Sequence, residues 1–296
     1  MREELPLLSN LFLAVVALAL LLAWWVAPPS MSHMLALLVL LVVSGLPHGA
    51  LDVLLLRRLG RRWRWWMALY AAVALLVVGL WRFFPGWMFG IFLLISWFHF
   101  GVTDRLLSGR LAGGLEGVAR GGAPLCLVAG LHSAEALELF SWLVPVVAAE
   151  QAVSSLQRLL PLWAAALLAT LWLAARGREW RVVTELLALL LLFWQLPPLA
   201  AFALYFALLH APRSILLLPP LLPGLAGRQW LAAALWPTAL SLAAALLALG
   251  WLQRLEGVAL EQSLVQVLFI GLAALTLPHV LLWGWLALRP PGAAVR

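Results

Sequence analysis

Residues 46–52, with the sequence LPHGALD, lie inside an apolar run that extends over residues 34–56. Ionisable side chains are costly inside a membrane and are functional candidates there by default. His48 and Asp52 are four residues apart, so a helix places both on one face. The stretch therefore predicts a membrane-spanning helix that carries part of a functional site.

The composition of the whole chain is that of a membrane protein. Of its 296 residues, 65% are hydrophobic and 10% are charged, and the mean hydropathy is +1.04. A soluble domain of this length cannot bury so much apolar surface. The net charge of +7 comes from arginine alone, and these arginines lie mostly in short connections, which indicates membrane topology rather than a nucleic-acid surface. The single cysteine, Cys126, excludes an internal disulfide and a multi-cysteine metal site.

Hydropathy predicts an all-α fold, a polytopic bundle of eight to ten transmembrane helices. No polar stretch is long enough to fold separately, so we expect a single integral membrane domain over residues 1–296. Two prolines at residues 197 and 198 divide the seventh segment from the eighth, because they cannot continue a straight helix. The apolar segments are residues 10–27, 33–56, 66–83, 86–103, 117–132, 156–176, 182–196, 197–217, 230–252 and 263–288.

Arginine clusters alternate with arginine-poor or acidic connections along the chain. The densest cluster lies at residues 57–64, and the most acidic connection lies within residues 135–150. Positively charged connections face the cytoplasm, so the alternation places both termini and the clusters, including Arg289 and Arg296, on that side. We therefore expect a multi-pass protein of the cell inner membrane with cytoplasmic N- and C-termini.

Four histidines share a helix direction and a depth in this topology. They are His48, His99, His210 and His279. Each precedes the next arginine by three to ten residues, a spread of about 10 Å at 1.5 Å per residue. One histidine in an apolar helix is more often a packing residue, but four unrelated ones have no reason to lie at one level. We predict that the four surround one metal ion, whereas His33 and His132 lie at the outer ends of their segments.

Four neutral imidazoles form a ligand set that suits iron, zinc or copper. Zinc would favour a closed tetrahedral site, whereas ferrous iron would keep positions open for oxygen and an oxidisable substrate. Aromatic neighbours of the histidines, such as Trp97 and Phe98, suit a long apolar molecule supplied by the lipid bilayer. Two other interpretations stay open: a haem protein with bis-histidine ligation, and a proton-coupled membrane transporter that relays protons through His–Asp pairs.

Five short motifs follow one another between about residues 40 and 285. They are PHGALD at 47–52, FHFG at 98–101 with Asp104, ARGG at 119–122, Tyr205 and Phe206 with His210 and Arg213, and Pro278 with His279. Together they resemble the Brp/Blh family of β-carotene 15,15′-dioxygenases.

The resemblance implies a multi-pass membrane enzyme that uses Fe(2+) and molecular oxygen to split β-carotene at its central double bond into two retinal molecules. It also implies a role in retinal biosynthesis with a functional link to a retinal-binding rhodopsin. Carried over by position, the iron ligands would be the four histidines selected by depth, namely His48, His99, His210 and His279.

The chain has two aspartates, Asp52 and Asp104. A carboxylate ligand would occupy a position needed for oxygen, so we expect Asp52 to accept the N–H of an imidazole on a neighbouring helix. Asp52 thereby completes the predicted catalytic residues. Asp104 lies five residues after His99 and beside Arg105 at the end of its segment, and we expect it to matter less.

Overall fold

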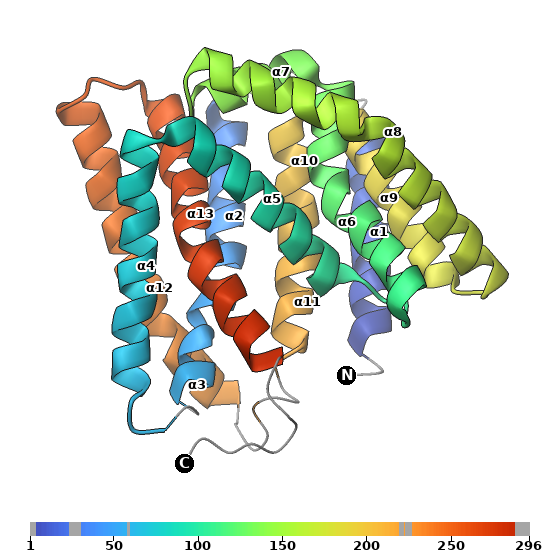
Figure 1. The fold of residues 1–296 in the computed structure, drawn as a ribbon, viewed down its shortest axis with the longest axis horizontal. Helices are drawn as coiled ribbons and strands as arrows, with labels where there is room; N and C mark the ends of the chain where they lie inside the picture. The colour runs from blue at the N-terminus through green and yellow to red at the C-terminus, as the bar shows by residue number, and fades with distance from the viewer. Residues whose placement is uncertain (1–3, 24–30, 58–59, 219–221, 223–226, 288–296) are drawn as a thin grey trace. The chain divides into compact units, whose positions relative to one another are not determined.

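A computed structural model describes residues 4–23, 31–57, 60–218, 222 and 227–287 of the chain. Over these residues the regular structure is entirely helical, without a β-strand (Figure 1). The helices are α1 (Glu4–Ala23), α2 (Met31–Ala50), α3 (Asp52–Arg57), α4 (Trp63–Phe83), α5 (Pro85–Asp104), α6 (Arg110–Leu131), α7 (Ser133–Ser141), α8 (Val146–Arg176), α9 (Trp180–Gln195), α10 (Pro198–Tyr205), the π-helical turn η1 (Phe206–His210), α11 (Ala211–Leu216), α12 (Gly227–Arg254) and α13 (Leu260–Ala287).

Each predicted apolar segment coincides with one helix or with consecutive helices. The segment at residues 33–56 is divided between α2 and α3, and the segment at 197–217 is formed by α10, η1 and α11 in succession. Seven described helical spans are long and apolar enough to cross a membrane, and α6 with α7, bent by 106°, would supply an eighth. The prediction of an all-α polytopic membrane bundle is confirmed.

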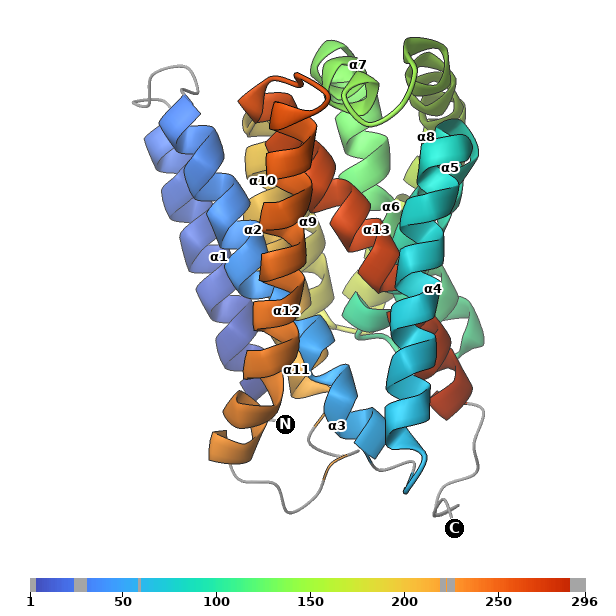
Figure 2. The same ribbon diagram turned by 90° about the vertical axis from the view of Figure 1, so that its left-hand side faces the viewer.

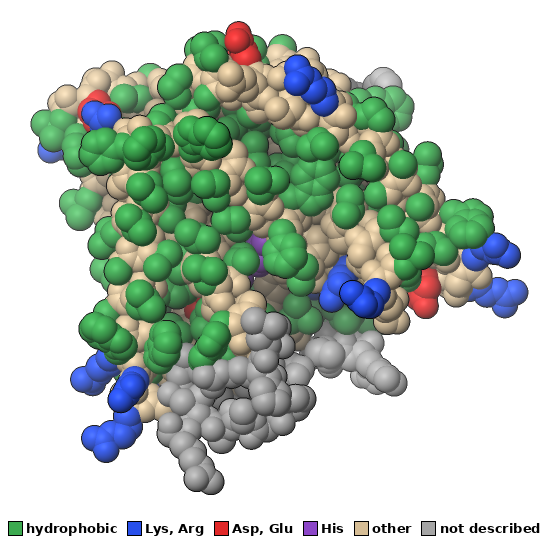
Figure 3. All heavy atoms as spheres, in the orientation of Figure 1, with side chains coloured by type: hydrophobic (Ala, Val, Ile, Leu, Met, Phe, Trp, Pro, Cys, Tyr) green, Lys and Arg blue, Asp and Glu red, His purple; other side chains and the backbone are tan. Residues whose placement is uncertain are grey.

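Large hydrophobic side chains remain exposed along these helices. Trp87 is 78% exposed, and Phe83 and Leu247 are each 76% exposed. Figure 3 shows hydrophobic side chains over most of the visible surface. Exposed apolar surface of this extent is unfavourable in water and favourable against lipid tails.

The described chain forms two compact units. The first comprises Met1–Leu41 and Ser96–Leu216, and the second comprises Val42–Ile95 and Leu217–Arg296. In the first unit α6 packs against α8 and α9, and α1 packs against α9 and α11. In the second unit α13 packs against α4 and α12, and α3 lies beside the start of α4 (Figure 2).

In the first unit the end of α5 approaches α6 closely because glycines line the contact. Glycines recur at every fourth position of α6 between residues 113 and 121, so they share one face of that helix. A Cβ atom added to Gly121 would lie 2.0 Å from the main-chain oxygen of Trp97, and one added to Gly101 would lie 2.3 Å from that of Gly117. Small residues at this spacing let membrane helices meet backbone to backbone. The contact fixes the part of α5 that ends at Asp104.

Gly121→Ala is therefore expected to destabilise the protein, because the new methyl group overlaps a main-chain atom that cannot move independently of α5. Overpacking of this kind costs about 1–3 kcal/mol. Gly114→Ala is the matched control on the same helix, since nothing lies within 4 Å of its added Cβ atom. Thermal unfolding of the purified variants in detergent measures the difference. A midpoint for Gly121→Ala at or above that of Gly114→Ala would contradict the expectation.

Candidate functional site

The first unit contains a buried contact among a histidine, an aspartate and a tyrosine. His210 Nδ1 lies 3.3 Å from Asp104 Oδ1, and the Tyr205 hydroxyl donates a 2.6 Å hydrogen bond to Asp104 Oδ2. All three residues are fully buried. Because a carboxylate only accepts hydrogen bonds, Nδ1 of His210 carries a proton in this contact, and the lone pair of a neutral ring is then on Nε2.

His99 reaches the same place from α5. Its Nε2 atom lies 3.2 Å from Nε2 of His210, and the two rings meet nearly at a right angle. Zinc–nitrogen bonds are about 2.0–2.1 Å, so two such bonds at roughly a right angle separate their nitrogens by about 3 Å. The spacing between His99 and His210 therefore fits two neighbouring ligands of one metal ion.

The η1 turn brings Tyr205 and His210 to one carboxylate although they are five residues apart. In an α-helix that separation turns the side chains about 140° away from each other. Here the N–H of Ala211 bonds to the carbonyl of Phe206, five residues earlier, so the turn holds an additional residue. The wider turn accommodates Pro212, whose ring would otherwise clash with the carbonyl four residues before it. Turns of this kind occur frequently at functional sites.

Buried ion pairs from α6, α9 and α11 surround this contact. Glu185 lies 2.8 Å from the guanidinium of Arg120 and 2.8 Å from that of Arg213, and it also accepts a hydrogen bond from the Ser9 hydroxyl. Arg213 in turn donates a 2.7 Å hydrogen bond to the main-chain oxygen of Asp104. Since buried charges persist only when they are paired, this network holds the end of α5 against α9 and α11.

Glu116 completes the network at the end of α5. It pairs with Arg120 at 2.6 Å and accepts hydrogen bonds from the N–H groups of Leu106 and Leu107. The fully buried groups of the first unit thus include three carboxylates, those of residues 104, 116 and 185, against the guanidiniums of residues 120 and 213. Among these described groups the carboxylates exceed the guanidiniums by one, and a protonated imidazole or a bound cation would balance the difference.

The second unit contains a corresponding contact. His279 Nδ1 of α13 lies 2.8 Å from Asp52 Oδ2, and Tyr70 of α4 donates a 3.0 Å hydrogen bond to the same oxygen. Trp283 donates to the other oxygen over 3.2 Å. His279 therefore also carries a proton on Nδ1, and the lone pair of a neutral ring is then on Nε2. The predicted contact between Asp52 and an imidazole of another helix is confirmed.

The other predicted positions have different outcomes. His48 lies near the end of α2, but its side chain is outside the described part of the structure. Among the described side chains no three metal-ligating groups come together. His33 is exposed on α2, and His132 joins α6 to α9 through a 2.8 Å contact between its Nε2 and the main-chain oxygen of Phe193. The expected cytoplasmic residues Arg289 and Arg296 also lie outside the described residues.

The expectation that Asp104 matters less than Asp52 stays a prediction. Asp104 ends α5, as predicted, but it is fully buried and contacts His210 and Tyr205. Although Asp104 is five residues from His99, both side chains reach the imidazole of His210. Glu185 was not predicted, although an acidic residue inside an apolar segment is a signal of the same kind as the histidines.

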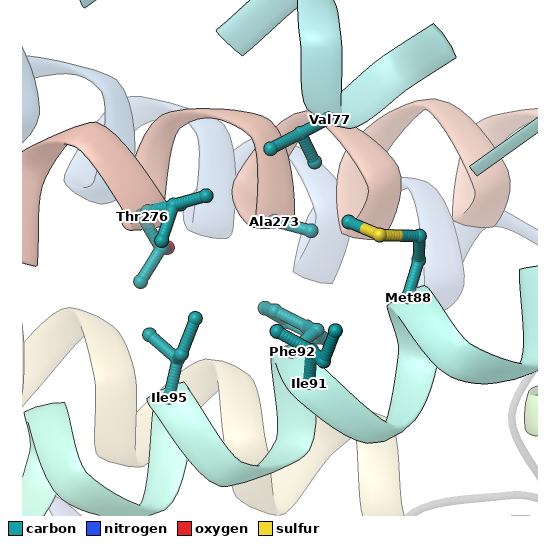
Figure 4. A pocket seen from close by; sticks show the side chains of 8 residues that line it. Val77, Met88, Ile91, Phe92, Ile95, Ala273 and Thr276 are labelled. Atoms are coloured by element: carbon teal, nitrogen blue, oxygen red, sulfur yellow. The ribbon is translucent and has the colours of Figure 1, made fainter. Parts of the chain in front are cut away.

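A small apolar pocket lies between α4, α5 and α13 of the second unit (Figure 4). Its lining residues are Val77, Met88, Ile91, Phe92, Ile95, Ala273, Thr276 and Leu277. Thr276 supplies the one polar side chain among them, so the pocket is apolar, but its volume of about 10 Å³ holds no more than a water-sized group. Leu277 is two residues before His279 on α13, which connects the pocket to the Asp52 contact through a single helical turn.

Comparisons with known proteins point to a single family. The family model described as Beta-carotene 15,15'-dioxygenase matches residues 39–287, which include all four predicted histidines. A protein of an uncultured marine bacterium, 66A03, named Beta-carotene 15,15'-dioxygenase, is 28% identical over 272 residues that cover 88% of this chain and 95% of that protein. No solved structure matches the chain. Because the family model extends over well more than half of its residues, the chain belongs to the β-carotene 15,15′-dioxygenase family.

Proposed function

We propose that the protein cleaves β-carotene at its central double bond to give two molecules of retinal. In this proposal molecular oxygen is the second substrate, and one ferrous ion is held by the four histidines His48, His99, His210 and His279. The family and the name of the matched relative support the reaction. The exposed apolar side chains of the helices suit a substrate that arrives through the bilayer.

The observation that carries the metal site is the pair of buried Asp–His contacts. Histidines that bind metals almost always donate their other ring N–H to a carboxylate, a carbonyl or water. His210 and His279 both have Nδ1 against a buried aspartate, which is the orientation in which an imidazole coordinates a metal through Nε2. A packing histidine needs no such arrangement, and finding it in both units favours ligation over packing.

The residues of this chain would have different roles around the ion. Ferrous iron, when bound, would supply the redox activity that lets oxygen react with a hydrocarbon double bond. Asp52 and Asp104 hold the tautomers of two imidazoles, and since both carboxylates are engaged there, they leave coordination positions to oxygen. The rings of Phe100 and Phe206, with centroids 4.6 and 5.3 Å from that of His210, keep water away from this imidazole.

The proposal is tested by expression in a bacterial host that makes β-carotene. We expect the colour to fade and retinal to appear as the sole cleavage product, whereas two unequal fragments would contradict central cleavage. Purified protein should lose activity with a ferrous chelator and regain it with Fe(2+). A Soret band in active protein would instead select the haem interpretation, and proton-coupled transport that survives chelation, with no retinal formed, would select the transporter.

The same proposal includes the cell inner membrane, cytoplasmic termini and delivery of retinal to a retinal-binding rhodopsin. The arginine-rich connection at residues 60–64 supports this orientation. Cys126 is buried on α6, so a cysteine introduced at Arg61 would be the accessible thiol of the protein. Labelling of that position by an impermeant reagent from outside intact cells would overturn the orientation.

A further inference from the structure

We infer that Tyr70 and Tyr205 are matched positioning residues, one in each unit, that hold the two aspartates in place. Each aspartate in turn fixes one imidazole, so the tyrosines act on metal binding through a carboxylate. The inference rests on the proposed iron centre, and it assigns a role to Tyr70 and to Tyr205, which until now was only part of a sequence motif.

The two contacts have the same composition although they lie in different units. The chain has two aspartates and two tyrosines, and each tyrosine donates its hydroxyl to one aspartate. In both cases the same carboxylate meets Nδ1 of a histidine on another helix. His210 and His279 lie 106 and 227 residues after the aspartates that they contact, so these contacts do not arise from local spacing.

The choice of tyrosine over phenylalanine at these positions also argues for a specific role. The chain has twelve phenylalanines and only two tyrosines. A position that needs an aromatic ring only for packing is therefore usually a phenylalanine. Tyr205 is fully buried, where an unpaired hydroxyl would be costly. Both tyrosine hydroxyls are therefore placed where a carboxylate accepts them.

The two contacts differ in how strongly they depend on the tyrosine. Oδ2 of Asp104 accepts a hydrogen bond from the Tyr205 hydroxyl, and Oδ1 contacts Nδ1 of His210, so the tyrosine fixes the rotation of the carboxylate. Oδ2 of Asp52 contacts both the Tyr70 hydroxyl and Nδ1 of His279, while Oδ1 accepts a hydrogen bond from the Trp283 indole N–H. Loss of the Tyr70 hydroxyl leaves Asp52 with another donor, so we expect the larger effect at Tyr205.

The experiment compares Tyr205→Phe and Tyr70→Phe with Asp104→Asn and Asp52→Asn. Thr170→Val is the matched control, because it also removes a fully buried hydroxyl, one that bonds locally within α8. The readouts are the affinity of metal-free protein for Fe(2+) and the absorption spectrum of Co(2+) bound in its place, which reports ligand geometry. Neither readout requires turnover.

Loss of a partner that orients a ligand costs about 10- to 100-fold in metal affinity, and we expect this for the two Asp→Asn variants. Because the tyrosines act one step further away, Tyr205→Phe should lower the affinity about threefold to tenfold and shift the Co(2+) spectrum. Tyr70→Phe should cause a smaller loss of affinity and a smaller spectral shift, and Thr170→Val should match the wild type in both. If Tyr205→Phe does not fold, Tyr70→Phe, which lies at a half-buried position, still tests the role.

Wild-type affinity and an unchanged spectrum in folded Tyr→Phe variants would overturn the inference. If the Asp→Asn variants still lose affinity in that case, the proposed metal centre stands and only the role of the tyrosines fails. If the wild-type protein binds neither Fe(2+) nor Co(2+), or if binding is unaffected by the Asp→Asn variants, the proposed metal centre fails and the inference fails with it.

Discussion

Replacing His210 by alanine should abolish both Fe(2+) binding and carotene cleavage. The His210 ring is fully buried, its Nδ1 is held by Asp104, and its Nε2 lies 3.2 Å from that of His99. Removal deletes a proposed ligand and leaves the buried Asp104 carboxylate without its imidazole partner. The loss should therefore exceed the roughly 10- to 100-fold effect of removing an outer partner. We expect the same result at His48, His99 and His279.

The measurements are iron per folded protein and retinal formed per minute. His33→Ala is the control, because this side chain is exposed on α2, and it should retain both. His132→Ala should also retain activity, although the loss of its contact with the Phe193 carbonyl should lower thermal stability. Near-normal turnover in two or more of the four ligand variants would refute the four-histidine centre.

Glu185→Ala should produce the largest loss of stability among single substitutions of the buried charges. Glu185 is fully buried and meets two guanidiniums, so its removal leaves Arg120 and Arg213 with less compensation. Breaking a buried ion pair by removing one partner costs about 3–5 kcal/mol. Arg213 also donates to the main chain of Asp104, and we expect iron affinity to fall with stability.

The free energy of unfolding in mixed detergent measures this effect. Glu150→Ala is the matched control, because Glu150 is an exposed glutamate on α8. A free energy of unfolding for Glu185→Ala that equals that of Glu150→Ala would mean that the network does not stabilise the fold.

The helices could be predicted from the sequence because a membrane-spanning segment is a local property of about 20 residues. The division of residues 33–56 into α2 and α3 was less visible, although Pro47 and Gly49 both weaken a helix there. The histidines could be selected from the sequence alone because ionisable residues are rare in apolar segments. Their role as iron ligands, the orientation in the membrane and the single domain stay predictions.

The partners of the histidines could not be predicted because they depend on which helix faces which. Tyr205 and Asp104 are 101 residues apart, and Tyr70 and Asp52 belong to different helices of the second unit. Five residues separate His99 from Asp104, which is about 140° around one helix, yet both side chains reach His210 of η1, so the angle on one helix does not predict a shared partner. The η1 turn was hidden as well, since no residue pattern separates a π-helical turn from an α-helical one.

That turn also offers a way to recognise the arrangement in other chains. A π-helical turn is equivalent to one residue inserted into an α-helix, so deleting a residue between Tyr205 and His210 would restore an α-helical turn in which the two side chains are four residues, or about 40°, apart. The tyrosine and the histidine would then still share one face of the helix. A related chain that keeps both residues should therefore space them either five residues apart with a π-helical turn or four residues apart without one, so the interval reveals the turn better than the histidine alone.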